Sequence, residues 1–189
     1  MSVRERLTIA DLAHIPDPVD DTRYELIDGE LHVSTQPSWE HQYTTIQFGG
    51  ALREWDRRAG LGIILPAPGV IFAEDEAVAP DLVWVRRERF AHLVGDDHKL
   101  HAAPDLVVEV LSPGRRNRER DLEVKLDLYS RRGVEEYWIA DWVDRSVQVH
   151  RRREARLRLE LTLRQGDRLT SPLLPGFEAD VGELFPPPT

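Results

Sequence analysis

The sequence predicts a single α/β (α+β) domain with a mixed central sheet flanked by helices. The chain has 189 residues, of which 41% are hydrophobic, so it is long enough for one well-packed core and short for two. Short apolar stretches with the periodicity of strands surround two longer stretches with the periodicity of helices. Their central order is helix, several strands, helix, strand, which is the order expected of a mixed sheet with helices packed on it.

The N-terminal half is predicted to hold a hairpin, a helix and several short strands. The stretch "YELIDGELHVST" indicates two strands about a tight Asp28-Gly29 turn. Apolar residues then recur at helical spacing between Glu40 and Ala59, and Ser38 is in place to cap that helix. Short strands are expected near residues 62–65, 69–73, 81–86 and 105–111.

The C-terminal half is predicted to add a second helix and further strands. The helix covers roughly 117–132, with Asn117 as its cap and Gly133 as its stop. The phrases "EEYWIADW" and "RSVQVHRR" indicate a hairpin that turns at Val143-Asp144, and "RLRLELTLR" alternates as another strand. Loops are expected at 87–103 and 164–180, with a domain core of about 22–163 and a C-terminal extension at 164–189.

Composition and motifs argue against several classes of protein. No apolar run approaches the roughly 18 residues that span a bilayer, the N-terminus lacks the apolar core of a signal peptide, and the absence of cysteine excludes disulfides and thiolate metal sites. We therefore expect a cytoplasmic protein with no membrane partner. The chain contains no G-x-S-x-G, P-loop or dinucleotide fingerprint. A net charge of −9 is a mild argument against a nucleic-acid partner. The stretch "RRNRER" at 115–120 is locally basic, but composition alone favours solvated surface as its explanation.

Two acidic residues stand on strands where carboxylates are costly. Glu109 lies between Val108 and Val110 in the most apolar run, and Asp81 belongs to the similar phrase "PDLVWV". If their strands are neighbours, the two side chains converge at one end of the sheet. Converging carboxylates repel one another and need a neutralising partner, for which a hard divalent cation such as Mg²⁺ is suited. The alternative for Glu109 is a core acid paired with an arginine.

Lys125 is unusual because the chain uses arginine almost everywhere else. Of the 25 basic residues only two are lysines. On the predicted second helix, Leu122, Leu126 and Tyr129 form the stripe that packs on the sheet, and Lys125 lies at its margin. Asp121 precedes it by one helical turn, a favourable acid-then-base spacing. The lysine is thus placed to reach the carboxylate end of the sheet, or else it is a surface charge paired with Asp121.

Several phrases of the chain resemble the bacterial Uma-two family, whose members are described as restriction-endonuclease-like proteins of the PD-(D/E)XK nuclease superfamily. The resemblance runs from about residue 7 to 185. It implies the mixed central sheet flanked by helices of the restriction-endonuclease-like fold, to which this chain adds an N-terminal hairpin and C-terminal strands. The phrases are "RYELIDGELHVSTQPSWEHQ", "APDLVWV", "PDLVVEVLSPGRRNRERDLEVKLDLYSRRGVEEYWIAD" and "SPLLPGFEADVGELF".

The resemblance also implies a catalytic site. Its first acid is Asp81 and its second is Glu109, which would hold Mg²⁺ or Mn²⁺. The superfamily lysine usually stands two residues after the second acid, where this chain has Leu111, so its role is assigned to Lys125 on the following helix. Further pocket residues are expected at Glu30, His41 and Asp121, and phosphate contacts at Arg115, Arg116, Arg118 and Arg120.

The function implied is a metal-dependent endonuclease, specifically an endodeoxyribonuclease that works as a homodimer. RNA or a smaller phosphodiester is the alternative substrate. A second hypothesis is a catalytically silent nuclease fold that binds a protein partner or forms a homodimer. Trp138 and Trp142 would serve such an interface, although core packing also explains them.

Overall fold

The computed structural model describes residues 6–12, 14–15 and 22–187 of the chain. Its strands are β1 (Arg23–Ile27), β2 (Glu30–Ser34), β3 (Gly62–Pro66), β4 (Val70–Ala73), β5 (Glu76–Val78), β6 (Leu82–Arg86), β7 (Leu106–Val110), β8 (Glu136–Asp141), β9 (Ser146–Arg153), β10 (Arg156–Arg164), β11 (Arg168–Thr170) and β12 (Glu178–Asp180). Its helices are α1 (Ile9–Leu12), α2 (Trp39–Ala59), α3 (Arg87–Leu93), α4 (Arg115–Glu119) and α5 (Lys125–Arg132). A π-helical turn η1 (Arg120–Val124) joins α4 to α5, and a 3-10 turn η2 (Val181–Leu184) follows β12.

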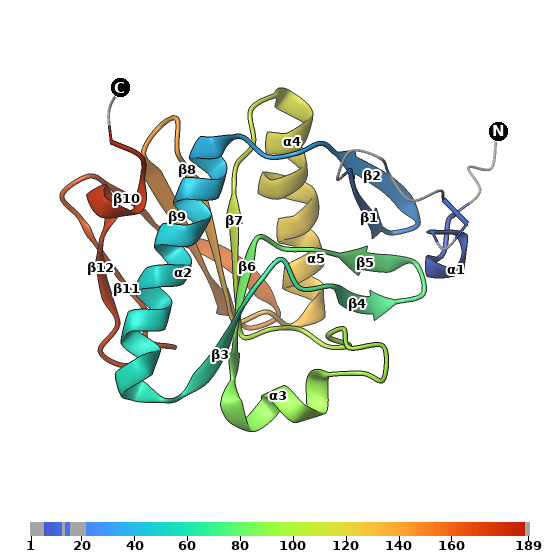
Figure 1. Cartoon of the computed structure of the whole chain (residues 1–189), viewed down its shortest axis with the longest axis horizontal. Coiled ribbons are helices and arrows are strands. Elements are labelled where there is room, and N and C mark those ends of the chain that lie inside the picture. Colours follow the sequence, from blue (N-terminus) through green and yellow to red (C-terminus); the bar gives the residue numbers. More distant parts are fainter. Residues whose placement is uncertain (1–5, 13, 16–21, 188–189) are drawn as a thin grey trace.

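A six-stranded sheet with the order β10-β9-β8-β7-β6-β3 forms the centre of the fold, and a smaller sheet with the order β2-β1-β5-β4 lies beside it (Figure 1). Neighbours in the large sheet are antiparallel except β7 and β8, which are parallel and connected through α4, η1 and α5. The predicted mixed sheet flanked by helices is therefore confirmed.

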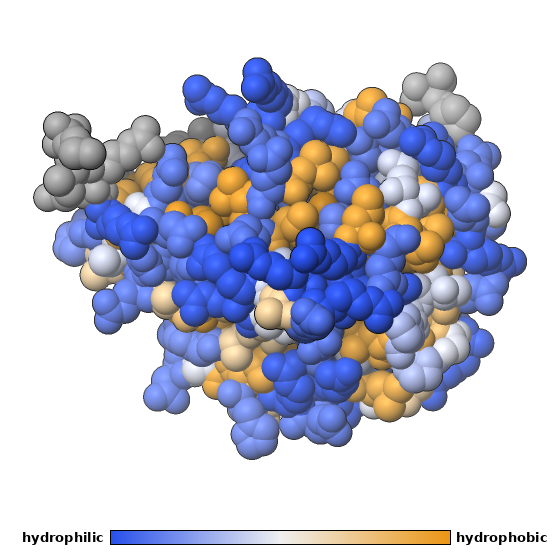
Figure 2. Space-filling model, turned by 180° about the vertical axis from the view of Figure 1, so that it is seen from behind, coloured by the Kyte–Doolittle hydropathy of each residue, from blue (hydrophilic) through white to orange (hydrophobic). Residues whose placement is uncertain are grey.

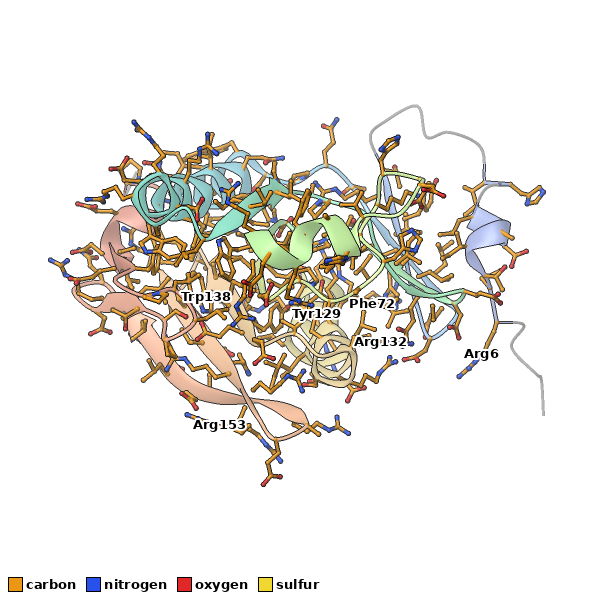
Figure 3. The ribbon with its side chains drawn as sticks, turned by 90° about the horizontal axis from the view of Figure 1, so that it is seen from below. Arg6, Phe72, Tyr129, Arg132, Trp138 and Arg153 are labelled. Atoms are coloured by element: carbon orange, nitrogen blue, oxygen red, sulfur yellow. The ribbon has the colours of Figure 1, made fainter. Side chains whose placement is uncertain are left out.

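The alternation of strand residues divides the core into two layers on opposite faces of the large sheet. From β7, Val108 and Val110 face the layer covered by α2, whereas Val107 faces the layer covered by α5. Figure 3 shows α2 and α5 on opposite sides of the sheet, with Trp138 and Tyr129 in the interior. Since Trp138 is fully buried against aromatic rings of the first layer, core packing accounts for it.

The N-terminal hairpin and the first helix agree with the prediction. Asp28 and Gly29 have φ angles of 53° and 73°, the positive values that a two-residue turn of this kind requires at both positions. Ser38 caps α2 by accepting a hydrogen bond from the backbone N–H of His41 at 3.4 Å. The hairpin turn and the helix cap are each determined by residues that are adjacent in the sequence, so the local sequence predicts them well.

Two stretches that were expected to be loops contain regular structure. Residues 87–103 include α3, and residues 164–180 include the paired strands β11 and β12. Strands of three residues are too short to show an alternation, and their position is decided by Leu169 and Ala179, which pack into the core beside α2. Strand β5 and helix α1 are similarly short and were not predicted.

The second helix differs from the predicted one at its start. It begins at Arg115, and Asn117 lies inside it, where the side-chain amide donates a hydrogen bond to the Pro113 carbonyl at 3.0 Å. Asn117 is therefore not the cap. The predicted stop is confirmed, because Gly133 ends α5 with a φ of 95°, which only glycine adopts easily.

The face in Figure 2 is largely hydrophilic, with hydrophobic residues visible between the charged ones. Many arginines pair with acids, as Arg151 does with Glu136 at 2.8 Å and with Glu160 at 3.0 Å. Within the described ranges, no helix is both long enough and apolar enough to cross a membrane.

Glu76 on β5 links the small sheet to the end of α5. Its carboxylate is buried and forms ion pairs with Arg131 and with Arg132, whose Nε lies 2.6 Å from Glu76 Oε2. Burial raises the pKa of the Glu76 carboxyl, but the hydrogen bonds from the two guanidinium groups outweigh burial and hold the pKa below its usual value.

Replacing Glu76 by glutamine is expected to lower the free energy of unfolding by about 2 kcal/mol at pH 7, because two partly buried guanidinium groups lose their counter-charge. The folded-state pKa lies below the unfolded value of 4.5, so this stabilisation is present above pH 4.5 and is lost as the pH falls through the folded-state pKa. In urea unfolding, the difference between wild type and Glu76→Gln should shrink in acid. Glu178→Gln, which removes an exposed pair with Arg168, is the control and should cost less than about 0.5 kcal/mol; equal losses in both variants would contradict the prediction.

Candidate active site

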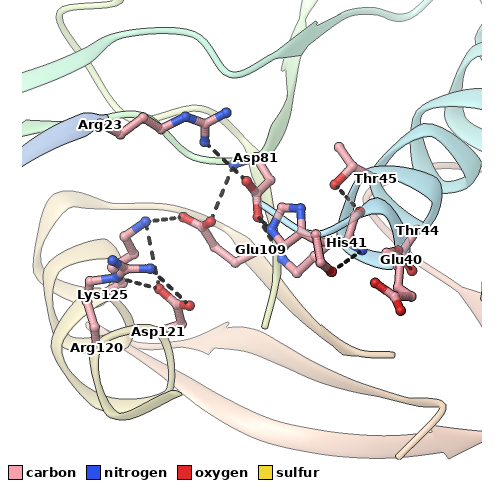
Figure 4. A network of polar contacts seen from close by, with 12 residues as sticks. Arg23, Glu40, His41, Thr44, Thr45, Asp81, Glu109, Arg120, Asp121 and Lys125 are labelled. Carbon is pink, nitrogen blue, oxygen red and sulfur yellow. Dashed lines mark hydrogen bonds and ion pairs between the residues drawn. The ribbon is translucent and has the colours of Figure 1, made fainter. Parts of the chain in front are cut away.

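Asp81 and Glu109 lie side by side at one end of the β6–β7 pair. The antiparallel register pairs Leu82 with Val108, which places the preceding residue Asp81 opposite Glu109. The backbone N–H of Asp81 donates to Glu109 Oε2 at 3.3 Å, and the N–H of Val110 donates to Asp81 Oδ2 at 2.9 Å (Figure 4). Both carboxylates are buried, so the two acids share a small, poorly solvated space.

A π-helical turn brings the lysine to these acids. The backbone N–H of Lys125 bonds to the Arg120 carbonyl, five residues back. The extra residue per turn places Asp121 and Lys125 inside, at 2% exposure each, while Leu122 and Leu126 are only partly buried. The expectation of Lys125 at the margin of the buried stripe was wrong, because a regular helical wheel does not hold across a π-helical turn.

The Lys125 ammonium group stands among carboxylates. Its Nζ is 2.9 Å from Glu109 Oε1, 2.9 Å from Glu25 Oε1 and 3.8 Å from Asp121 Oδ1. Burial lowers the pKa of Lys125, but these negative charges outweigh burial, so the pKa is raised and the side chain is charged. The structure thus brings Asp81, Glu109 and Lys125 into one cluster, together with Asp121.

Glu25 on β1 is a member of this cluster that the sequence analysis missed. It is buried, accepts a hydrogen bond from the Ala79 N–H at 2.9 Å, and pairs with Lys125. Burial raises the pKa of Glu25, but the charges of Lys125 and Arg120 lower the pKa by more than burial raises it. The carboxyl is therefore ionised. The signal that singled out Glu109, an acid inside an apolar strand, was present for Glu25 as well.

The two central acids have different proton affinities. Burial raises the pKa of Asp81, yet the hydrogen bond from His41 and that from the Val110 N–H bring it down to about 2. Burial raises the pKa of Glu109 to about 8; the Lys125 charge opposes this, while the neighbouring carboxylates add to it. Asp81 is therefore ionised at neutral pH, whereas ionisation of Glu109 is disfavoured unless a further positive charge lies beside it.

His41 holds Asp81 from the first turn of α2. Its Nε2 lies 3.0 Å from Asp81 Oδ2, and its side chain is buried. Within the described part of the chain, Nδ1 of this ring is buried without a hydrogen-bond partner. The contact positions the Asp81 carboxylate from the side opposite to Glu109, as Figure 4 shows.

Glu30, which was expected in the pocket, lies outside it. It is exposed at the start of β2 and lines a separate hollow together with Arg116 and Asn117. Glu25 fills the place that Glu30 was expected to take. In the hairpin Glu25 lies opposite His32 and reaches Lys125, whereas Glu30 lies opposite Ile27, beside the turn.

The four arginines expected to contact phosphate divide into two groups. Arg118 pairs with Asp141 at 2.7 Å, and Arg120 pairs with Asp121 at 3.0 Å, so both guanidinium groups are engaged by acids of the chain. The two that lie exposed in α4 are Arg115 and Arg116.

The chain matches the Uma2 family over residues 9–182, a family described as "Putative restriction endonuclease". The protein belongs to the Uma2 family. Its structure is similar to a crystal structure described as "a putative nuclease belonging to DUF820 from Anabaena variabilis ATCC 29413", with a TM-score of 0.74 and 16% identity over 95% of this chain and 97% of that one. No curated protein matches the sequence. At this identity the structural similarity establishes the restriction-endonuclease-like fold.

Restriction-endonuclease-like proteins such as the Uma2 family generally use divalent metals, and the residues around Asp81 and Glu109 fit one. A cavity of about 30 Å³ lies against both acids, room for about one water molecule or ion. Four carboxyl groups line it against three side chains of arginine or lysine, so ionisation of Glu109 leaves one negative charge for a cation to neutralise. In the described residues no three His, Cys, Asp or Glu side chains form a complete metal cage, but Mg²⁺ is typically bound by one or two carboxylates with waters and substrate phosphates.

Proposed function

We propose that this Uma2 protein is an Mg²⁺- or Mn²⁺-dependent endonuclease that hydrolyses phosphodiester bonds of DNA. The observation that carries the proposal is the meeting of Asp81 and Glu109 on neighbouring strands, with the Lys125 ammonium 2.9 Å from Glu109, beside a small cavity. An acid pair and a lysine on these elements are what the family resemblance leads one to expect of a nuclease site.

Each residue of the cluster has a distinct task in this reaction. A divalent cation held by Asp81 and Glu109 would polarise the phosphoryl oxygen and lower the pKa of the attacking water. Lys125 holds Glu109 in place and offsets negative charge that develops on the phosphoryl group. His41 and the Val110 N–H fix the orientation of Asp81.

Hydrolysis then exchanges one bond at phosphorus for another. The oxygen of water bonds to phosphorus and loses a proton, while the bond between phosphorus and one sugar oxygen breaks and that oxygen gains a proton. The products are one strand end with a phosphate and one with a hydroxyl group. Buried carboxylates that already carry a lysine partner suit this chemistry, because no side chain needs to move into the site.

Titration with Mn²⁺ tests the metal site separately from catalysis. We expect the wild-type protein to bind Mn²⁺ and Asp81→Asn to bind it at least about tenfold more weakly, since it loses a charged ligand. Asp127→Asn, which removes the same charge from the outer face of α5, is the control and should bind as wild type does. Calorimetry at neutral pH measures all three.

Plasmid DNA and duplex RNA, each incubated with wild-type protein and Mn²⁺, identify the substrate. Cleavage of DNA is expected. A wild-type protein that neither binds Mn²⁺ nor cuts either polymer would contradict the proposal and favour the alternative of a catalytically silent, protein-binding or homodimeric module. Homodimer formation stays a prediction, which light scattering would check.

A further inference from the structure

Arg23 connects the acidic cluster with solvent. It is the first residue of β1, and because alternate residues of a strand point to the same side, its side chain lies on the same face as Glu25. Both residues line the cavity beside Asp81 and Glu109. Unlike buried Glu25, the Arg23 side chain is 37% exposed.

The two oxygens of Asp81 differ in how firmly they are held. Oδ2 accepts the Val110 N–H at 2.9 Å and lies 3.0 Å from His41 Nε2. Oδ1 faces the Arg23 guanidinium at 3.4 Å, the long end of the hydrogen-bond range. An ion pair of this length with one exposed partner contributes little to stability. Arg23 is thus not required to keep Asp81 in place, and Oδ1 is the oxygen that can exchange its partner.

Arg23 is the most accessible of the cations around the cavity. The other two in the described residues, Arg120 and Lys125, are 12% and 2% exposed and are held at 3.0 Å or less by carboxylates. Figure 4 shows Arg23 beside Asp81 and Lys125 beside Glu109, so each of the two acids is contacted by one cationic side chain. A phosphate group that enters from solvent meets Arg23 before it meets either of the others.

We propose that Arg23 is a catalytic residue that binds a non-bridging oxygen of the scissile phosphate, exchanging its long contact with Asp81 for the substrate. The inference rests on the proposed function and adds to it a substrate contact from β1, outside the arginine-rich stretch 115–120. The planar guanidinium has several donors in a fixed geometry that matches phosphate oxygens. Phosphate would then lie between a fixed cation, Lys125, and an exchangeable one, Arg23.

Three variants test this inference through metal binding, duplex binding and cleavage. Arg23→Gln is expected to bind a fluorescent DNA duplex in EDTA about tenfold more weakly and to cleave it in Mn²⁺ about 100-fold more slowly. Its affinity for Mn²⁺ without DNA should be equal to or above that of wild type, because the Asp81 carboxylate loses a competing cation. Arg23→Lys should recover part of the cleavage. The control Arg53→Gln removes an exposed charge from α2, away from the cavity, and should change each quantity less than twofold.

The possible failures are distinguishable. Wild-type cleavage and duplex affinity in Arg23→Gln would overturn the inference and leave the proposed function intact. A large fall in melting temperature or in Mn²⁺ affinity in both Arg23 variants would overturn it as well, by showing that Arg23 supports the fold or the metal site. A wild-type protein that neither binds nor cuts the duplex would overturn the inference and the proposed function together.

Discussion

The substitution Glu109→Gln is expected to lower the rate of metal-dependent cleavage by a factor of about 10³ or more, while the protein stays folded. The carboxamide keeps one oxygen, which accepts the hydrogen bonds from Lys125 and Tyr129, each 2.9 Å long in wild type, and gives up only the longer 3.3 Å bond from the Asp81 N–H. It removes the negative charge that a cation beside Asp81 needs. Plasmid nicking in Mn²⁺, together with the midpoint of thermal unfolding in EDTA, measures both effects.

The stability of Glu109→Gln should equal or exceed that of wild type in EDTA. Burial and the neighbouring carboxylates make ionisation of Glu109 costly, as its raised pKa shows, and glutamine avoids that cost. The control is Glu123→Gln on the exposed side of η1, which should retain cleavage. Wild-type cleavage by Glu109→Gln would remove this residue from the proposed site.

Lys125→Met is expected to cause the largest loss of stability of the variants considered, about 3–5 kcal/mol, and to abolish cleavage. Methionine retains most of the side-chain volume but removes the only buried ammonium of the cluster described above. Glu25 and Asp121 then lose a neutralising charge in a poorly solvated space. Urea unfolding at pH 7 measures the loss.

A second substitution separates the two roles of Lys125. Adding Glu25→Gln removes one of the carboxylates that the lysine neutralises, so the double variant should regain a large part of the lost stability. Its cleavage should stay undetectable, because the ammonium group that contacts Glu109 is gone. If the double variant were both stable and active, Lys125 would be a structural residue with no part in the chemistry.

The local sequence determined the elements whose signals lie within a few residues. The Asp28-Gly29 turn, the Ser38 cap and the Gly133 stop are each set by the φ angle or side chain of one or two positions, and all three are present. The same holds for the alternation in β7, which placed Glu109 and Val108 on opposite faces of the sheet. The fold class followed from the order of these elements.

Short elements were beyond the reach of local signals. Strands β11 and β12 form because Leu169 and Ala179 are covered by the core layer under α2. Three residues are too few to show the alternation that would predict a strand. The local sequence did not predict the π-helical turn in the second helix either. Its one extra residue per turn moves Lys125 from the expected margin of the buried face to full burial.

By itself, the sequence determined that an acid stands inside an apolar strand and that a rare lysine follows on a helix. Only the tertiary structure decided that Glu25, rather than Glu30, shares that lysine, and that Arg23 stands beside Asp81. The physical reason is that a buried charge is stabilised by whichever opposite charges lie within a few ångströms. These partners come from strands and helices far apart in the chain, so their identity depends on how the two sheets and α5 pack.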